Sequence, residues 1–513
     1  MKKKLICGAL LISMLAATFT SCGGSSSSGS TGNNGGDAAQ GEAYTPNPDE
    51  EPYNVKFLYL LAQEGDHYDD IKAAVNEQCL KDINMTVEFI PVTYGTMDTT
   101  LNMMLPAGEA LDVFTTWGSN SSTYLDSGYI RNWADYEQNL PDVKEWLGDN
   151  INCCYIGDTW VVIPSNYERC AWTSFLVRND ILQELGHDVS EYEGIDVTDF
   201  SSFDKLTELF AEVKAAHPEM TVINGTMAMG MQNACYVDGL SDGFGVLENY
   251  GQTTTVTNWY ESEQWKQICE LNKVWYDAGY ASADIVTNQD SIEPLLKAGN
   301  LFCGICNAKP NTKAEKLSQC AQDIEVIKIS STMLSTGNFT NGFSLASASE
   351  DPAKAAAWYN WAFTSQEFND LINWGIEGVD WVENDQGLAT YPEGKDATSV
   401  GYHNDYGWIY PNQMVGHAWE GNDPDVWDSY IEFNKGDYVS KGHGFRYNNA
   451  PVIDQVVACT AVQDQYRKSL VYGAVADIDA TIAEFNEKLY AAGLQDIIDE
   501  KQRQLDEFLA AKG

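Results

Sequence analysis

The sequence predicts an α/β protein with two lobes, each built around a mainly parallel β-sheet that is flanked by helices. The first observation behind this prediction is that strand-like and helix-like segments alternate from residue 54 to residue 116, which is typical of βαβ crossovers. The second is the length of 513 residues, which is more than one hydrophobic core usually holds. The third is an ordinary globular composition, with 44% hydrophobic and 12% aromatic residues. We therefore expect lobes of about 150 to 250 residues.

The N-terminal residues 1–21 are predicted to be an export signal. They have a basic start and an apolar core, Leu5–Phe19, which is too short to cross a bilayer as a helix of the mature protein. The run that follows, Thr20-Ser21-Cys22-Gly23, looks like a lipoprotein cleavage site at which Cys22 becomes the lipidated first residue. We therefore expect the protein on the extracellular face of the cell membrane, anchored there by a lipid on Cys22.

Residues 22–52 are predicted to be a flexible tether. The stretch Gly23–Gly36 consists of Gly, Ser, Thr and Asn, so it lacks the apolar side chains that a folded core requires. As a random coil, the tether would hold a folded body on the order of 30 Å from its anchor.

A formal net charge of −45 limits the partners that the protein can have. Nucleic acids and anionic membrane surfaces are disfavoured, because both repel a strongly acidic protein and the chain beyond Lys2–Lys4 has no cluster of Lys and Arg to offset the charge. We interpret the charge as a solvated acidic surface that keeps the protein soluble, and we expect a monomer with no nucleic-acid partner.

The alternating segments of the first half are three strands and two helices. The predicted strands are Asn54–Leu61, Met85–Val92 and Leu111–Thr116, and the predicted helices, each with one apolar face, are Tyr68–Ile83 and Tyr94–Leu105. Ligands of parallel sheets bind beyond the carboxyl ends of the strands. Two side chains that follow such ends are therefore candidate ligand contacts: Glu64 and Trp117.

A later stretch combines a strand, two helices and a loop. Phe343–Ala346 is a predicted strand, and the helix after it begins at Pro352. A second helix, Gln366–Trp374, ends at Gly375, because glycine readily leaves the helical conformation. The loop that follows is a place where ligands are often bound, which gives two further candidate contacts: Trp374 and Glu377.

The run Asn373–Gly378, NWGIEG, placed after this strand and helix pair, resembles the extracellular solute-binding proteins, family 1, of ABC importers. Within that family the chain looks most like the LipO-type lipoproteins. The segments Gly442–Phe445 and Ala450–Val452, followed by Ala492–Leu494 and Asp499–Asp506, are similar to the family's terminal domain. The resemblance covers nearly the whole mature chain.

The resemblance implies a two-lobed, periplasmic-binding-protein-like fold (type II) with a hinge between the lobes. Lobe 1 is then expected to contain residues 53–166 and 331–382. Lobe 2 is expected to contain residues 167–330 and 383–513, including a C-terminal helical subdomain. The function implied is reversible capture of a saccharide, expected to be an oligosaccharide, in the cleft between the lobes and its delivery to the permease subunits of an ABC importer.

Further candidate ligand contacts follow from the resemblance. Val161–Arg178 is similar to the first crossing between lobes, and Leu295–Lys309 is similar to a helix, buried strand and polar loop of the family. The side chains that we expect at the cleft from these segments, and from the Gly-rich stretch after residue 232, are Tyr167, Trp172, Tyr236, Asn307 and Lys309. We expect most aromatic residues after Trp381 to pack within the lobe rather than to bind ligand: Tyr391, Tyr402, Tyr406, Trp408, Tyr410, Trp419 and Trp427.

The chain has twelve cysteines, and beyond Cys7 and Cys22 their spacing fixes no disulfide pairing. Cys303 and Cys306 have the spacing of a zinc or redox pair, but they lie in an apolar, strand-like run without a second such pair. Buried free cysteine behaves as a small apolar residue. We therefore interpret this pair as part of a core and expect neither a metal nor a cofactor.

No catalytic signature is present: the chain lacks Gly-x-Ser-x-Gly, His-Glu-x-x-His and a phosphate-binding loop that ends in Gly-Lys-Ser/Thr. We therefore expect a binding protein rather than an enzyme. The alternatives that stay open are a binding protein for another small polar solute such as a peptide, a secreted glycan-active enzyme, and a surface adhesin or sensor without a permease.

Overall fold

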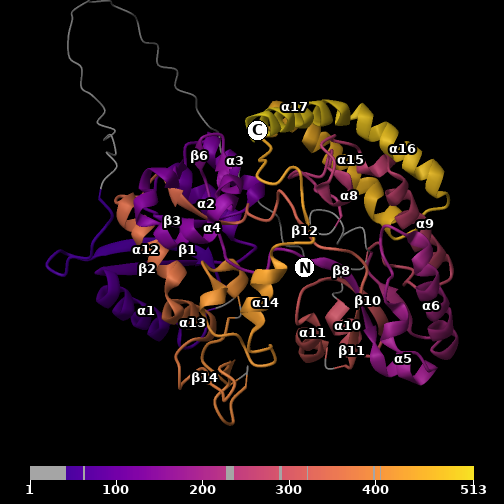
Figure 1. The fold of residues 1–513 in the computed structure, drawn as a ribbon, viewed down its shortest axis with the longest axis horizontal. Coiled ribbons are helices and arrows are strands. Elements are labelled where there is room, and N and C mark those ends of the chain that lie inside the picture. Colours follow the sequence, from indigo (N-terminus) through magenta and orange to yellow (C-terminus); the bar gives the residue numbers. More distant parts are fainter. Residues whose placement is uncertain are drawn as a thin grey trace, which may run out of the picture. The chain divides into compact units, whose positions relative to one another are not determined.

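The structure is a computed structural model of the 513-residue chain, and it describes residues 42–61, 64–226, 236–287, 292–320, 322–396, 399–404 and 406–512. The predicted signal peptide, Cys22 and most of the predicted tether lie outside these residues. Residues 40–513 form one unit of mutual contacts, which contains all the elements described below. Figure 1 labels its helices and strands.

The first β-sheet comes mostly from the N-terminal part of the chain. Strand β1 (Tyr53–Leu60) runs parallel to both β2 (Met85–Val92) and β3 (Val113–Thr116). Beyond β3 lies β13 (Gly342–Ala346), which returns from far along the chain and runs antiparallel to β3. The sheet has the order β2-β1-β3-β13-β4, and the two short strands that also pair with β13 are β4 (Ile130–Arg131) and β7 (Ile163–Pro164).

Amphipathic helices connect and cover this sheet. In the first of them Tyr68, Ile71, Val75 and Cys79 recur at helical spacing and are buried, which explains why this segment forms a helix against the sheet. Helix α12 (Pro352–Thr364) begins at Pro352. Asp351 caps it by accepting a hydrogen bond from the backbone N–H of Lys354 at 3.1 Å. The helices of this part are α1 (Tyr68–Ile83), α2 (Met97–Ala107), α3 (Gly118–Asp126), α4 (Pro141–Leu147), α12 (Pro352–Thr364) and α13 (Gln366–Trp374).

The second β-sheet has the order β11-β8-β10-β9, formed by β8 (Trp172–Arg178), β9 (Thr221–Asn224), β10 (Leu301–Ala308) and β11 (Ile324–Lys328). Strand β8 runs antiparallel to both of its neighbours, whereas β10 and β9 are parallel. The expectation of mainly parallel strands is therefore wrong for this sheet. The reason is that β8 enters directly from the first sheet, without the helical crossover that places sequential strands parallel.

Helices also surround the second sheet, and the predicted helical C-terminus is confirmed. Lys501 on the last helix is fully buried, and its Nζ contacts Asp242 Oδ1 at 2.5 Å and the carbonyl oxygens of Phe244 at 2.8 Å and Gly245 at 3.0 Å. The C-terminal helix is thereby attached to an irregular segment far away in the sequence. The helices of this part are α5 (Asn179–Leu185), α6 (Asp204–Ala216), α8 (Glu248–Gly251), α9 (Glu263–Asp277), α10 (Ile292–Lys297), α11 (Thr312–Cys320), α15 (Ile453–Val471), α16 (Ile478–Ala491) and α17 (Leu494–Lys512).

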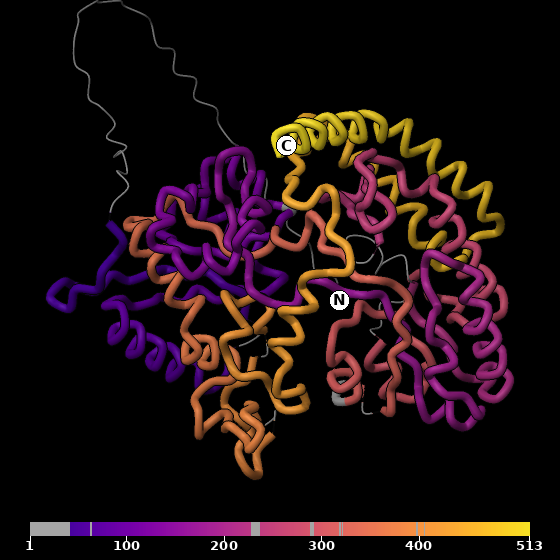
Figure 2. The backbone as a smooth tube through the Cα atoms, in the orientation of Figure 1, coloured from indigo at the N-terminus to yellow at the C-terminus, as the bar shows by residue number. Residues whose placement is uncertain are grey.

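Each sheet has its own hydrophobic core, which confirms the predicted α/β fold with two lobes. Phe57, Phe343 and Trp358 lie in the first core, whereas Phe175, Phe210 and Phe485 lie in the second. The chain passes from the first sheet to the second between β7 and β8, at residues 165–171. It returns between β11 and β13, at residues 329–341. We call these two segments the first and second chain passages, and Figure 2 traces both. The remaining elements are β5 (Tyr155–Ile156), β6 (Thr159–Trp160), β12 (Met333–Leu334), β14 (Val382–Glu383), β15 (Ala389–Thr390), β16 (Tyr438–Val439) and α14 (Val426–Phe433).

The division of the chain between lobes at residue 382 stays a prediction. Tyr402, Ile409 and Tyr410 follow this position, yet they pack into the first core, where the ring of Tyr410 lies 5.9 Å from that of Tyr59. We therefore propose that residues 383–410 belong to lobe 1 rather than to lobe 2.

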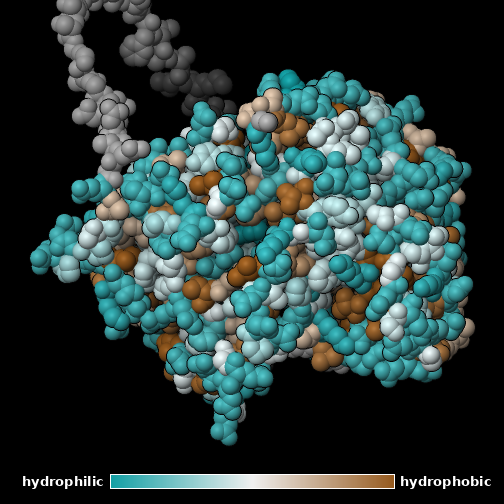
Figure 3. Space-filling view, in the orientation of Figure 1, coloured by the Kyte–Doolittle hydropathy of each residue, from teal (hydrophilic) through white to brown (hydrophobic). Residues whose placement is uncertain are grey.

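The surface is hydrophilic over most of the face that Figure 3 shows, with apolar residues in separate groups. Within the described residues, no helix combines the length and the apolar character that crossing a membrane requires.

Candidate functional site

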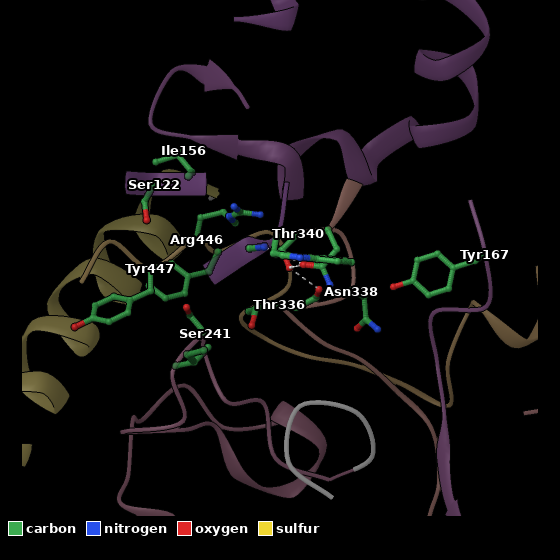
Figure 4. A pocket seen from close by; sticks show the side chains of 15 residues that line it. Ser122, Ile156, Tyr167, Ser241, Thr336, Asn338, Thr340, Arg446 and Tyr447 are labelled. Carbon is green, nitrogen blue, oxygen red and sulfur yellow. Dashed lines mark hydrogen bonds between the residues drawn. The ribbon is translucent and has the colours of Figure 1, made fainter. Parts of the chain in front are cut away.

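A cavity of about 410 Å³ lies where the two cores and the chain passages between them meet. Its walls come from the turn between β3 and α3, from both chain passages, and from the segments around residues 240 and 446 (Figure 4). Such a volume is within the range of about 300 to 1,000 Å³ that small-molecule sites occupy. The lining residues are Trp117, Gly118, Ser122, Ile156, Tyr167, Leu240, Ser241, Thr336, Gly337, Asn338, Thr340, Asn341, Phe445, Arg446 and Tyr447.

The turn from β3 into α3 places Trp117 at this cavity. The backbone N–H of Trp117 donates to Asn120 Oδ1 at 3.1 Å, and that of Gly118 donates to Asn341 Oδ1 at 2.9 Å. A Cβ on Gly118 would lie 2.5 Å from Thr340 Oγ1, so the two segments meet this closely only because residue 118 is glycine.

Aromatic side chains form a continuous platform beside the cavity. The rings of Trp117 and Tyr94 are stacked, as are those of Tyr94 and Trp408, whose centroids lie 6.4 Å apart. Trp408 in turn meets Tyr167 edge to face at 6.4 Å, and Tyr406 packs against Tyr94. Tyr94 is 51% exposed and Trp408 is 37% exposed, so both side chains are partly open to solvent. We call these five residues the aromatic platform.

Polar groups from the second chain passage face the same cavity. Asn338 is fixed by donating from Nδ2 to the carbonyl oxygen of Arg169 at 2.5 Å and accepting from Ser335 Oγ at 2.8 Å. Thr340 donates to the carbonyl oxygen of Gly337 at 2.9 Å. In Figure 4 the hydroxyl of Tyr167 points toward these residues. Burial raises the pKa of Tyr167, so this hydroxyl keeps its proton and remains a donor at neutral pH.

Arg446 is the one charged side chain among the described residues that line the cavity. It reaches from the C-terminal part of the chain to α3, where its Nη2 donates to Ser121 Oγ at 2.8 Å. Burial lowers its pKa, and the other groups that act on it are the thiols of Cys154 and Cys153. An arginine remains protonated in spite of such a shift, so the cavity holds a positive charge.

Two of the residues predicted as ligand contacts meet at this cavity. Trp117 and Tyr167 both line it and belong to the aromatic platform. Their contact with a ligand stays a prediction.

Trp172 and Lys309 line a different cavity of about 580 Å³, beside α11 and β11. There Lys309 Nζ forms an ion pair with Glu168 Oε1 at 2.6 Å, and the ammonium group of Lys328 lies over the ring of Trp172 at 4.8 Å. The structure therefore separates these two residues from Trp117.

The other predicted contacts lie away from the cavity lining. Trp374 is 6% exposed and packs against Trp419 at 4.8 Å, where it donates from Nε1 to the carbonyl oxygen of His417 at 3.0 Å. Tyr236 packs against Tyr250 at 4.9 Å. The remaining three are exposed, on a loop after β1, on β10 and on the loop after α13: Glu64, Asn307 and Glu377. Ligand roles for these residues stay predictions.

Several residues of the cavity and of the aromatic platform were not among the candidates. Tyr94 lies two residues beyond the end of β2, so the rule that ligands bind beyond strand ends was a signal that could have found it. Tyr406 and Trp408 were expected to pack within a lobe, yet they belong to the aromatic platform. Nothing in the sequence around Arg446 marks it as a cavity residue.

Eight of the described cysteines are free thiols, and all of them except Cys306 are buried: Cys79, Cys153, Cys154, Cys269, Cys303, Cys306, Cys320 and Cys459. Burial raises the pKa of the Cys306 thiol to about 12 and raises that of Cys303 well above its ordinary value. Both thiols are therefore protonated and poor metal ligands at neutral pH. Among the residues that the structure describes, no three His, Cys, Asp or Glu side chains gather where they could hold a metal ion.

Two family models match the chain. The model described as bacterial extracellular solute-binding protein matches residues 72–377, and that of a domain of unknown function (DUF3502) matches residues 441–510.

Known proteins resemble the chain over most of its length. It is 22% identical over 474 residues to a carbohydrate ABC transporter substrate-binding protein of Streptococcus pneumoniae, a match that covers 89% of this chain and 91% of that protein. The solved structure of the N-glycan transport solute-binding protein of Streptococcus pneumoniae superposes with a TM-score of 0.75 at 18% identity, covering 90% of this chain and 100% of that one. A solute-binding protein of Bifidobacterium longum infantis that binds HMO superposes with a TM-score of 0.65 at 15% identity, covering 90% and 100%.

Proposed function

Since the chain belongs to the bacterial extracellular solute-binding proteins, we propose that it is the binding component of an ABC importer and that its solute is an oligosaccharide. The oligosaccharide binds in the cavity beside Trp117. It is then released to the permease without chemical change. The observation that carries this proposal is the aromatic platform next to a rim of amide and hydroxyl groups.

The chemistry of the cavity suits a sugar. The side chains of Tyr94 and Trp408 are partly exposed, and flat aromatic rings pack well against the apolar C–H surfaces of a pyranose. Asn338, Thr340 and the hydroxyl of Tyr167 can exchange hydrogen bonds with sugar hydroxyls. A sugar that lacks a hydroxyl would leave one of these groups unpaired, at about 1 to 3 kcal/mol, which gives selectivity without catalysis.

The relatives support the same ligand class. The similar protein of Streptococcus pneumoniae has been solved in complex with Man1GlcNAc and with Man5GlcNAc. An oligosaccharide that is longer than the cavity would extend from it along the aromatic platform.

Binding is favoured over hydrolysis by the composition of the cavity. Glycoside hydrolysis usually requires two carboxyl groups about 5 to 10 Å apart across the bond that is cleaved. Neither Asp nor Glu is among the described residues that line the cavity. The same aromatic residues therefore serve capture and release rather than cleavage.

The protein would work as a monomer at the cell surface. A lipid on Cys22 would anchor it, the Gly- and Ser-rich tether would let it reach the permease, and movement about the two chain passages would close the lobes on the ligand.

Isothermal titration calorimetry tests the proposal with a panel of Man5GlcNAc, sialylated and desialylated N-glycans, oligogalacturonates and tetrapeptides. We expect binding of at least one saccharide, with no new reducing ends after incubation. Binding of peptides alone, no binding of any saccharide by the folded protein, or release of reducing ends would each contradict it.

A further inference from the structure

The charge of the cavity is opposite to that of the chain. The protein has 75 acidic and 30 basic residues besides histidine, yet Arg446 supplies the one charge among the described cavity residues, and this charge is positive. A positive centre within an otherwise uncharged cavity favours an anionic guest.

The guanidinium group of Arg446 has no carboxylate partner among the described residues. Its Nη2 donates to the neutral hydroxyl of Ser121, and its Nη1 is buried without a hydrogen-bond partner. Two other arginines do form ion pairs: Arg503 contacts Glu500 and Glu507, each at 2.6 Å, and Arg178 contacts Asp180. A buried cation without a counter-charge is destabilising unless something else supplies one.

Arg169 shows what a purely structural arginine looks like in the same region. It also has no ion pair, but it donates to the carbonyl oxygens of Ser165 at 2.6 Å and Asn338 at 3.3 Å. Its guanidinium group also lies over the rings of Phe339 and Trp146 at 4.4 and 4.9 Å. Arg446 lacks this set of acceptors, and unlike Arg169 it lines the cavity.

We infer that the oligosaccharide carries a carboxylate, as in a uronic or sialic acid, and that Arg446 binds this group. The inference rests on the proposed function and names the class of saccharide. A guanidinium group matches the two oxygens of a carboxylate with parallel hydrogen bonds, which gives both affinity and orientation. Figure 4 shows Arg446 and Tyr167 at opposite ends of the cavity, with Thr340 between them, so the acidic sugar lies at the Arg446 end and neutral sugars extend toward the aromatic platform.

Calorimetry on ligand pairs that differ only in charge tests the inference. The pairs are an oligogalacturonate against its methyl ester, a sialylated against a desialylated N-glycan, and sulfated against unsulfated lactose. The wild-type protein is expected to bind one of the first two acidic forms about tenfold to a hundredfold more tightly than its neutral partner, and this preference is expected to shrink at high salt.

Arg446→Gln is expected to abolish that preference while leaving the binding of the neutral partner nearly unchanged. Arg503→Gln is the matched control, because it removes the same charge from an exposed position on α17 outside the cavity. Arg446→Lys is expected to keep part of the preference. It retains the positive charge but loses the planar guanidinium group that donates two parallel hydrogen bonds. Circular dichroism checks the fold of each variant.

The outcomes separate the inference from the proposed function. Equal binding of the charged and neutral partners by the wild type, or equal losses on both in Arg446→Gln, would overturn the inference and leave saccharide capture intact. Tight binding of the sulfated form alone would overturn the carboxylate assignment. Should Arg446→Gln fail to fold, the salt dependence and the ligand preference of the wild type still show whether the protein selects a carboxylate-bearing saccharide. If no saccharide binds, both the inference and the proposed function fail.

Discussion

The rings of Tyr94 and Trp117 are parallel to within 6°, with their centroids 6.1 Å apart, although the two residues follow different strands. Tyr94→Ala removes the exposed half of this pair. We expect it to weaken saccharide binding by about 1 to 2 kcal/mol, or roughly fivefold to thirtyfold, measured by calorimetry. Tyr490→Ala, which removes a partly exposed tyrosine on α16, should leave affinity unchanged. An equal loss in both variants would contradict a role for the aromatic platform.

Gly118→Ala places a methyl group against Thr340 and is expected to lower the free energy of unfolding by about 1 to 3 kcal/mol, because neither segment can move without disturbing the turn into α3. Urea unfolding measures the change. Adding Thr340→Gly removes the atoms in the way, so the double variant should lose less than the sum of the single losses. Gly95→Ala is the control, since its new Cβ would meet one side-chain atom at 3.9 Å. Additive losses would contradict the steric explanation.

Lys501→Ala is expected to destabilise the protein by about 3 to 5 kcal/mol, because it leaves Asp242 and two carbonyl oxygens without their buried partner. The measurement is the urea midpoint of the transition that includes α17. The exposed Lys488 on α16 also forms an ion pair, with Glu484 at 2.9 Å, and Lys488→Ala should change the midpoint little. Similar shifts in both variants would contradict the importance of the buried contact.

His403 makes stability depend on pH. Burial lowers the pKa of His403 to about 4, from an ordinary value of 6.5, so between these values the unfolded chain binds a proton that the folded protein does not. The contribution is fully present above pH 6.5 and is lost as the pH falls toward 4, amounting to about 3 kcal/mol.

The test compares unfolding free energies of the wild type and His403→Gln from pH 7 to 4. The wild type is expected to lose more stability than the variant over this range. His187 is the control of opposite sign, because the hydrogen bonds that its ring donates to Glu212 and Glu191 raise its pKa, so its stabilisation is lost as the pH rises. Parallel curves for the wild type and His403→Gln would contradict the prediction.

Local pattern was enough to predict strands β1, β2, β3 and β13 of the first sheet, but not the short strands β4 and β7. The bounds expected for the segments at residues 68–83 and 85–92 are those of α1 and β2, because their apolar residues follow one period to the end of the element. The helix expected from Tyr94 begins at Met97 instead, since Thr93, Tyr94 and Gly95 form the turn that carries the aromatic platform.

The candidate site was less predictable, because it joins segments that are distant in the sequence. Trp117 and Tyr167 were found through strand ends and a family resemblance. Trp408 reaches the aromatic platform, and Arg446 the cavity, through contacts between distant segments that the spacing of apolar residues does not show. Trp374 was expected at the ligand because it ends a helix before a glycine; its indole packs against Trp419 and donates to the carbonyl oxygen of His417, and its ligand contact stays a prediction.

Two indole rings, Trp117 and Trp408, stand in the aromatic platform at the proposed sugar site. Indole emission responds to the polarity of its surroundings, so a guest that displaces water from these rings should shift the protein's intrinsic fluorescence without any label. The molecule thus contains its own optical reporter, with which solutes can be screened in minutes.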